Sequence, residues 1–134
     1  ALAAVALLTA ALLREARRTM LALLPIGAGL TMILGAMQLF GQAMNLFHVV
    51  SLPLVIGLGA DYGIFMVSHT DPATRRQTAR AVLFSGLTTL GGFGALVLAR
   101  HPALHSIGIT VLIGIGGAMV TALWVVPRLD GERA

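Results

Sequence analysis

The stretch LFHVVSLPLVIGLGADYGIFMVS, residues Leu46–Ser68, indicates what kind of protein this chain is. It is almost wholly apolar, and Asp61 is its only formally charged residue. A helix rises about 1.5 Å per residue and the hydrocarbon core of a bilayer is about 30 Å thick, so a segment of this length can cross a membrane. The stretch therefore predicts a membrane-spanning helix that carries a carboxyl group inside it.

The composition of the whole chain supports the same interpretation. Of its 134 residues, 57% are hydrophobic and 10% are charged, and the mean hydropathy is +0.93. A soluble domain usually carries about 25% charged residues, so this chain cannot cover itself with polar groups and its solvent must be lipid. There are no cysteines, which excludes disulfides and thiolate metal sites. The nine basic residues are all arginines that lie between apolar runs, so they do not predict a nucleic-acid partner.

Five apolar runs divide the chain, and the last four are long enough to span a bilayer. The first run is short, and it lacks the basic start and the cleavage site of a signal peptide, which is the rival interpretation. We therefore expect it to be the second half of a span, and residues 1–134 to be a fragment of a larger transporter. The predicted fold is an all-α, polytopic transmembrane helix bundle of about five spans, the first one truncated. The expected helices cover residues 1–13, 20–40, 46–68, 79–99 and 104–126.

The arginines predict the orientation of these helices. Successive connections lie on alternating sides of a membrane, and cytoplasmic connections are enriched in basic residues. One side then collects eight arginines and the other collects Arg100 alone, so we expect the C-terminus to face the cytoplasm. The eight are Arg14, Arg17, Arg18, Arg75, Arg76, Arg80, Arg128 and Arg133.

Small residues predict where the helices touch. In lipid, glycines let two backbones approach closely, and stripes of small residues mark helix contacts. Gly59 and Gly63 lie four apart, and Gly57 lies one turn before Asp61. Gly114 and Gly117 form part of a second stripe. We expect these five glycines to mediate packing within a compact bundle, and packing alone is enough to explain them.

Asp61 is the strongest candidate for a functional residue. An ionised Asp inside a span costs at least about 2.5–3.5 kcal/mol on insertion scales. Hydrocarbon favours the neutral form of a carboxyl group, so Asp61 can gain and lose a proton during a working cycle. The functional interpretation is a proton relay, and the structural one is a hydrogen bond to a neighbouring helix.

The partners of Asp61 must come from elsewhere. Tyr62 is adjacent and is the only tyrosine, but neighbouring helical residues point about 100° apart. Hydroxyls at Ser85, Thr88 and Thr89 on the following span can hydrogen-bond Asp61 or hold water beside it. The alternative is that they bond to carbonyls of their own helix.

The histidines are weaker candidates. His48 and His69 lie near the two ends of the third span, and we expect both to be interfacial. His101 and His105 are four apart, but Pro102 lies between them and no third ligand is evident, so no metal site and no cofactor are predicted. A nucleophile motif, a phosphate loop and paired carboxylates are absent from the sequence, and we therefore expect no enzymatic activity.

Three motifs together resemble the resistance–nodulation–division superfamily, and within it the MmpL-type exporters. The first is Gly-x-Gly-x-Asp-Tyr, carried by Gly57, Gly59, Asp61 and Tyr62. The second, loosely kept, consists of Ser85, Thr88, Thr89, Phe93 and Gly94. The third is the junction of His101–Leu104 with Gly108 and Ile109. The resemblance covers roughly residues 45–127.

The resemblance implies two repeats of six helices, each interrupted by a large extracytoplasmic domain. It also implies a proton-carrying Asp-Tyr pair on the fourth helix of each repeat, completed by the other repeat. Asp61 and Tyr62 match that pair, and this chain would supply helices two to six of the C-terminal repeat. The chain departs from the pattern because it contains no large extracytoplasmic domain, and with that domain the substrate path is missing.

We therefore expect export of hydrophobic or lipid-like cargo, driven by the proton-motive force across a bacterial inner membrane. The expected partners are the lipid bilayer, the cargo, and the N-terminal repeat and extracytoplasmic domains of the same protein. A homo-oligomer is left open. One alternative is a non-transporting sensor or scaffold of the same fold, such as those that bind sterols. The other is a membrane-embedded enzyme or assembly subunit, for which the sequence offers no catalytic pair.

Overall fold

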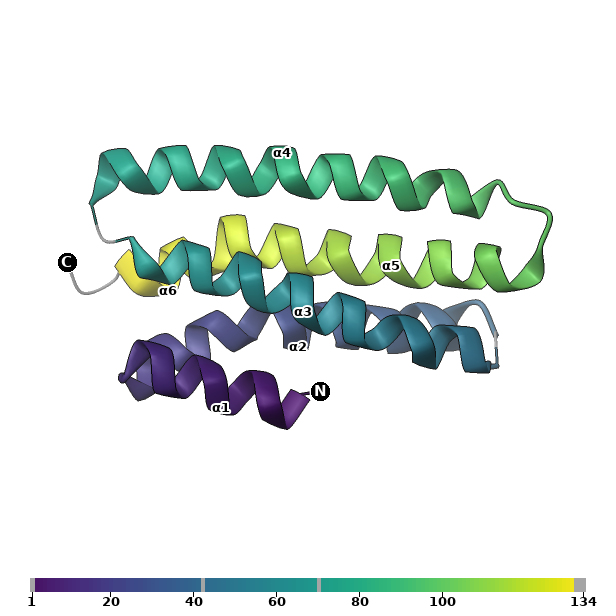
Figure 1. Ribbon diagram of the computed structural model, residues 1–134, viewed down its shortest axis with the longest axis horizontal. Helices are drawn as coiled ribbons and strands as arrows, with labels where there is room; N and C mark the ends of the chain where they lie inside the picture. Colours follow the sequence, from purple (N-terminus) through teal and green to yellow (C-terminus); the bar gives the residue numbers. More distant parts are fainter. Residues whose placement is uncertain (1, 42, 70, 132–134) are drawn as a thin grey trace.

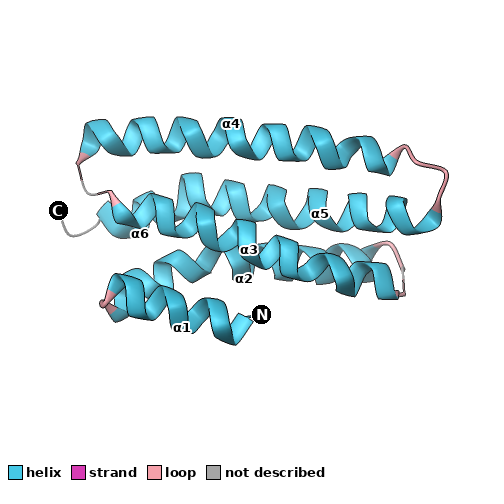
Figure 2. Ribbon diagram, in the orientation of Figure 1, coloured by secondary structure: helices cyan, strands magenta, loops and turns pink. Residues whose placement is uncertain are grey.

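The computed structural model describes residues 2–41, 43–69 and 71–131, and every secondary-structure element among them is a helix. Figure 1 shows long helices running side by side, and Figure 2 shows that only short loops join them. The all-α class is confirmed. The helices are α1 (Leu2–Leu13), α2 (Ala16–Leu39), α3 (Leu46–Ser68), α4 (Pro72–Val97), α5 (Pro102–Val120), the π-helix η1 (Thr121–Val125) and α6 (Val126–Gly131).

Four helical segments are long and apolar enough to cross a membrane, as expected. They are α2, α3, α4 and the continuous helix from Pro102 to Gly131 that comprises α5, η1 and α6. Large side chains stay exposed on their outer faces: Leu39 is 85% and Phe84 67% exposed. Because such surface is costly in water and favourable in hydrocarbon, these exposed faces are consistent with contact with lipid. The bundle is a polytopic membrane domain.

Helices α2, α4 and α5 begin earlier than the sequence predicts, and the last span ends later, at Gly131 rather than Val126. The shifts are largest at the starts of α4 and α2. Helix α4 begins at Pro72 rather than Ala79, because the Asp71 carboxylate accepts a hydrogen bond from Thr74 N at 3.0 Å and proline suits the first helical position. The Thr74 hydroxyl also donates to this carboxylate, and the two hydrogen bonds hold the pKa of Asp71 below its usual range. Helix α2 begins at Ala16 rather than Met20. In α2 and α4 the polar residues that precede the apolar run already belong to the helix. A hydropathy pattern marks only the apolar run, so it does not show that these residues are helical.

The core lies where α2, α3 and α5 meet, and glycines bring these helices together. A Cβ atom built at Gly63 would collide with the backbone carbonyl of Ala22, and one at Gly59 would lie 3.3 Å from Ile26 Cγ1. Helices α2 and α3 therefore touch backbone to backbone at this level. A side chain at Gly63 could be accommodated only if the two helices moved apart.

The stripe on α5 makes similar contacts with α2 and α3. A Cβ atom at Gly114 would lie 2.6 Å from Val55 Cγ1, and one at Gly117 would collide with Met32 Sδ. Gly57 differs, because a Cβ atom there would meet no heavy atom within 4 Å. The packing contact expected for Gly57 is therefore not formed within the described residues, and Gly57 instead lines a groove beside Asp61.

The π-helix η1 ends just before Pro127. Its last three residues lie two to four positions before this proline. Proline has no N–H to donate and its ring clashes with the carbonyl four residues earlier, so a helix must widen, bend or break near it. Here the widened turn lets the helix continue into α6. There Asp130 forms an ion pair with Arg75 of α4, and Leu129 O accepts a hydrogen bond from Arg17 of α2.

The arginines collect at one end of the bundle. The α1–α2 and α3–α4 connections and α6 lie at that end, and the α2–α3 and α4–α5 connections lie at the other (Figure 1). Seven of the eight arginines grouped by the sequence lie at or near the first end, and Arg100 lies at the second. Arg133 lies outside the described residues, as do Ala1 and Thr70.

Candidate functional site

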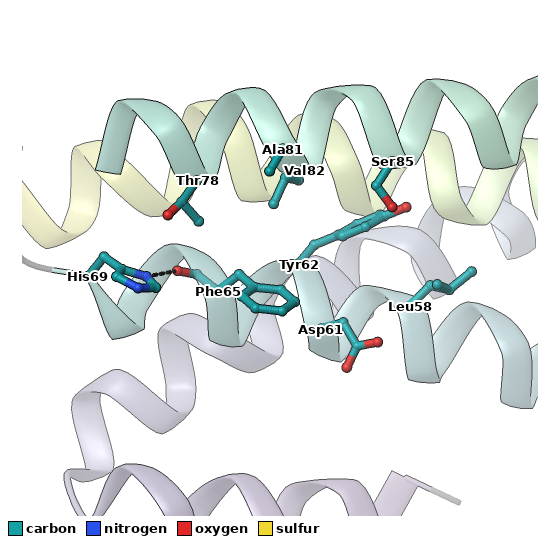
Figure 3. A pocket seen from close by; sticks show the side chains of 9 residues that line it. All are labelled: Leu58, Asp61, Tyr62, Phe65, His69, Thr78, Ala81, Val82 and Ser85. Carbon is teal, nitrogen blue, oxygen red and sulfur yellow. Dashed lines mark hydrogen bonds between the residues drawn. The ribbon is translucent and has the colours of Figure 1, made fainter. Parts of the chain in front are cut away.

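Asp61 and Tyr62 lie side by side on α3 but point in different directions. Figure 3 shows the Tyr62 ring extending toward α4, while the Asp61 carboxylate turns away from it. Tyr62 is only 3% exposed, and Asp61 is an exposed residue on the face of α3 between α1 and α4. The divergence follows from the helix, in which successive side chains are turned by about 100°.

Both residues line a cavity of 320 Å³ between α3 and α4. The cavity runs from the level of Asp61 to the end of α3, where His69 lies (Figure 3). Its polar groups are spread along its length and its remaining wall is apolar. The lining residues are Leu58, Asp61, Tyr62, Phe65, His69, Thr78, Ala81, Val82 and Ser85.

The Tyr62 hydroxyl is buried without a hydrogen-bond partner among the described residues. It lies beside Ser85, as Figure 3 shows, and Thr89 is also nearby. Gly86 lies next to this oxygen: a Cβ atom there would be 3.5 Å from it, an ordinary van der Waals distance, and would collide with Met119 Sδ of α5. A buried polar group without a partner costs about 1–3 kcal/mol, which invites a functional explanation.

The hydroxyls predicted to support Asp61 are only partly brought together. Ser85 lines the cavity, but Thr88 does not. Thr88 donates to Phe84 O at 2.8 Å and Thr89 donates to Ser85 O at 2.9 Å, so both follow the alternative of bonding within their own helix. Across the described part of the chain, none of the three donates a hydrogen bond to Asp61.

A second groove of 210 Å³ lies on the other side of Asp61, between α1 and α3. Gly57 forms part of its wall, and the open space beside this glycine keeps the groove next to the carboxylate. Thr9 of α1 also lines it, but its hydroxyl donates to Val5 O at 2.7 Å. Asp61 is thus bordered by open space on two sides, and within residues 2–41, 43–69 and 71–131 it has no salt-bridge partner.

The three histidines that do not line the cavity, His48, His101 and His105, each make a structural contact. His48 lies in the first turn of α3, where it is 3% exposed and forms a capping box with Asn45. Its position is fixed further because Asn45 Nδ2 donates to Ser106 Oγ at 3.0 Å across to α5. His101 caps α5, and His105 Nδ1 donates to Val97 O at 2.7 Å. Groups of three or more metal-ligating side chains are absent from the described segments.

Sequence reasoning did not single out Gly86 or the Asn45–Ser106 bond. One signal existed for each: Gly86 follows Ser85 directly, and Asn45 precedes an apolar run with a polar residue three positions later, as a helix cap does. Both contacts join residues far apart in the chain, so the partner could not be identified without the fold.

The fold and this site together define a polytopic helical membrane protein with a carboxylate inside one span. The family model described as the MMPL family matches residues 1–129, so the chain belongs to the MMPL family. This confirms the resemblance to MmpL-type members of the resistance–nodulation–division superfamily that the motifs indicated.

Several curated proteins are similar to the chain. A hopanoid transporter, HpnN, of Rhodopseudomonas palustris is 29% identical over 98% of this chain, which corresponds to 16% of the transporter. A membrane protein of Methanocaldococcus jannaschii is 30% identical over 87% of this chain and 33% of its own length. The transport protein MmpL4 of Mycobacterium leprae is 27% identical over 78% of this chain. The chain thus spans a third or less of these relatives, and no solved structure matches it significantly.

Proposed function

We propose that this chain is part of a transporter that exports hydrophobic or lipid-like cargo and is driven by protons crossing the membrane through Asp61. Family membership supports a transport role, and relatives named as hopanoid and MmpL transporters support a lipid-like cargo. The observation that carries the proton step is the position of Asp61. It is a carboxylate within a spanning helix, on an open face, without a basic partner in the described structure.

The physical argument concerns the two charge states of this carboxyl group. In hydrocarbon the ionised form is costly, so protonation from the outer side stabilises one arrangement of the helices around Asp61 and release inward stabilises another. One charge crossing the full field is worth about 2.3 kcal/mol per 100 mV. That free energy is available to move cargo when the two arrangements differ in the parts that bind it.

Tyr62 and Ser85 have supporting roles in this proposal. The Tyr62 hydroxyl has no hydrogen-bond partner among the described residues and lies beside Ser85 of α4 (Figure 3), and Tyr62 lines the same cavity as Asp61. It can donate to a water molecule or to a group from the other repeat of the full-length protein. The Thr88 and Thr89 hydroxyls donate to carbonyls of α4. We propose that they contribute to the proton relay only after a change of side-chain rotamer.

The remaining partners follow from the same proposal. The N-terminal repeat would cover the open face of α3 and complete the site, the extracytoplasmic domains would hold the cargo path, and the bilayer would surround the exposed apolar faces. We place the protein in the bacterial inner membrane with the arginine-rich end and the C-terminus in the cytoplasm, in accordance with the positive-inside rule.

The test is Asp61→Asn in the full-length protein, reconstituted in lipid vesicles with an imposed pH gradient. Asn keeps the size of the side chain but cannot carry a proton, so we expect transfer of a hopanoid probe and the coupled proton flux to fall at least about a hundredfold. The amount of protein in the membrane fraction and its thermal unfolding in detergent should both be unchanged.

Asp71→Asn is the matched control, because it makes the same chemical change outside the span and Asn also caps helices well. Its transfer rate should equal that of the unmodified protein. Full hopanoid transfer by Asp61→Asn would refute the relay. Binding of the probe without any proton-coupled transfer, in both the unmodified protein and the variant, would instead favour a non-transporting, sterol-sensing or scaffold role.

A further inference from the structure

We propose that His69 is the proton acceptor on the inward side of this site, taking up the proton that Asp61 releases and passing it to the cytoplasm. This inference rests on the proposed proton step at Asp61 and adds a second residue to it. Three observations carry it: the cavity that joins the two residues, the hydrogen bond that fixes the imidazole, and the position of His69 at the end of α3.

The cavity provides the connection. Asp61 and His69 line the same 320 Å³ space, and eight residues of helix separate them by about 12 Å along the axis. A direct transfer across that distance is excluded, but the space has room for on the order of ten water molecules. The Phe65 side chain lies between them in Figure 3, while Thr78 and Ser85 add hydroxyls to the opposite wall.

The hydrogen bond fixes which nitrogen reacts. His69 Nδ1 lies 3.2 Å from Phe65 O, drawn as the dashed line in Figure 3, and a carbonyl can only accept. Nδ1 therefore carries a hydrogen in both charge states, and Nε2 has the free lone pair in the neutral ring. The ring can bind a proton at Nε2 without turning, so its orientation toward the cavity is preserved.

The step is a simple proton transfer. The O–H bond of the Asp61 carboxyl breaks, cavity water conveys the proton, and an N–H bond forms at His69 Nε2, which leaves a carboxylate and an imidazolium. The imidazolium then releases the Nε2 proton to cytoplasmic water and becomes neutral again. Imidazole is suited to this role because its charge changes near physiological pH.

Few ionisable side chains share the cavity with His69. The titratable groups that share its cavity are Asp61 and Tyr62, both from α3, and the α4 side of the cavity contributes no charged side chain. Arg75 and Arg76 of α4 line a separate cavity with Met66 and Leu123. Protonated His69 therefore faces a carboxylate within its own cavity and no cation there.

The experiment measures the rate at which Asp61 exchanges its proton, without any cargo. The full-length protein in lipid nanodiscs is subjected to a light-triggered pH jump, and the infrared absorption of the protonated carboxyl group is followed over time. Asp61→Asn identifies the band. We expect His69→Ala to slow deprotonation about tenfold or more, because the acceptor is gone. Added imidazole should restore the rate, since His69→Ala leaves room for it in the cavity.

His105→Ala is the matched control. His105 also donates from Nδ1 to a backbone carbonyl, but it lies at the opposite end of the bundle and does not line this cavity. Its removal should leave the rate unchanged. An unchanged rate in His69→Ala, or a slow rate that imidazole does not restore, would overturn the role of His69 and leave the proton step at Asp61 standing. A spectrum in which Asp61→Asn removes no band would overturn the proton step itself.

Discussion

At the scale of single residues, the site depends on how two adjacent side chains are separated. Asp61 faces open space on two sides, and Tyr62 is buried next to Gly86 with no hydrogen-bond partner for its hydroxyl among the described residues. In the proposed relay, the acidic group needs access to water to exchange a proton, whereas the phenol is held in a fixed, buried position. The roughly 100° turn between neighbouring helical residues supplies both.

Tyr62→Phe separates the structural role of the hydroxyl from its functional role. The substitution keeps the buried ring and removes a polar group that has no hydrogen-bond partner in the described structure, so the free energy of unfolding should stay the same or rise slightly. Proton-coupled hopanoid transfer should nevertheless fall. Thermal unfolding in detergent and transfer between vesicles measure the two effects. A clear loss of stability would show that the hydroxyl is a structural group.

At the scale of elements, α3 presents a different surface to each neighbour. Its face toward α2 is made of glycines that allow backbone contact, and the face that carries Asp61 is left open between α1 and α4. Gly57 and Gly63 belong to the same helix, yet only Gly63 is in close contact. Gly57 instead leaves space beside the carboxylate.

Gly63→Ala should destabilise the bundle, because the new methyl group would collide with the Ala22 carbonyl and force α2 and α3 apart. A loss of about 1–3 kcal/mol in the free energy of unfolding is expected, as for other overpacked sites. Gly116→Ala is the control, since a Cβ atom there meets nothing within 4 Å. Equal unfolding temperatures for the two variants in detergent would contradict the close contact.

At the scale of the whole molecule, the distribution of arginines favours one orientation of the bundle in the membrane. Arginines gather at the end of the bundle that holds the α1–α2 connection, the α3–α4 connection and α6 (Figure 1). Two of them also join the C-terminal helix to the rest, through Arg17 with Leu129 O and Arg75 with Asp130. Arg17 and Arg75, which the proposed orientation places on the cytoplasmic side, thus also hold this end of the bundle together.

The sequence has no cysteine, so single cysteines can test this orientation. Ala43→Cys lies in the α2–α3 connection and Ala73→Cys lies in the first turn of α4, and both positions are exposed. In intact cells a membrane-impermeant maleimide should label Ala43→Cys and leave Ala73→Cys unlabelled until the cells are broken. The reverse pattern would place the arginine-rich end outside.

The sequence by itself determined the membrane setting, the helices and the family. Apolar runs must form helices in lipid because every backbone polar group has to be satisfied within its own segment. Spans are therefore readable from hydropathy, although the polar first turns of α2 and α4 are not. Asp61 could be identified for the same reason, since a charge in such a run is conspicuous on the printed sequence.

Only the tertiary structure decided which residues meet around Asp61. Hydropathy and spacing place Ser85, Thr88 and Thr89 on one helix, but the packing of α4 brings Ser85 to the cavity and leaves the two threonine hydroxyls bonded within α4. The packing of the helices also decided that Gly57 makes no close helix contact and that His69 lines the same cavity as Asp61. Hydrophobicity fixes which segments lie in the membrane, but the rotation of each helix is set by the close fit of side chains and glycines against its neighbours.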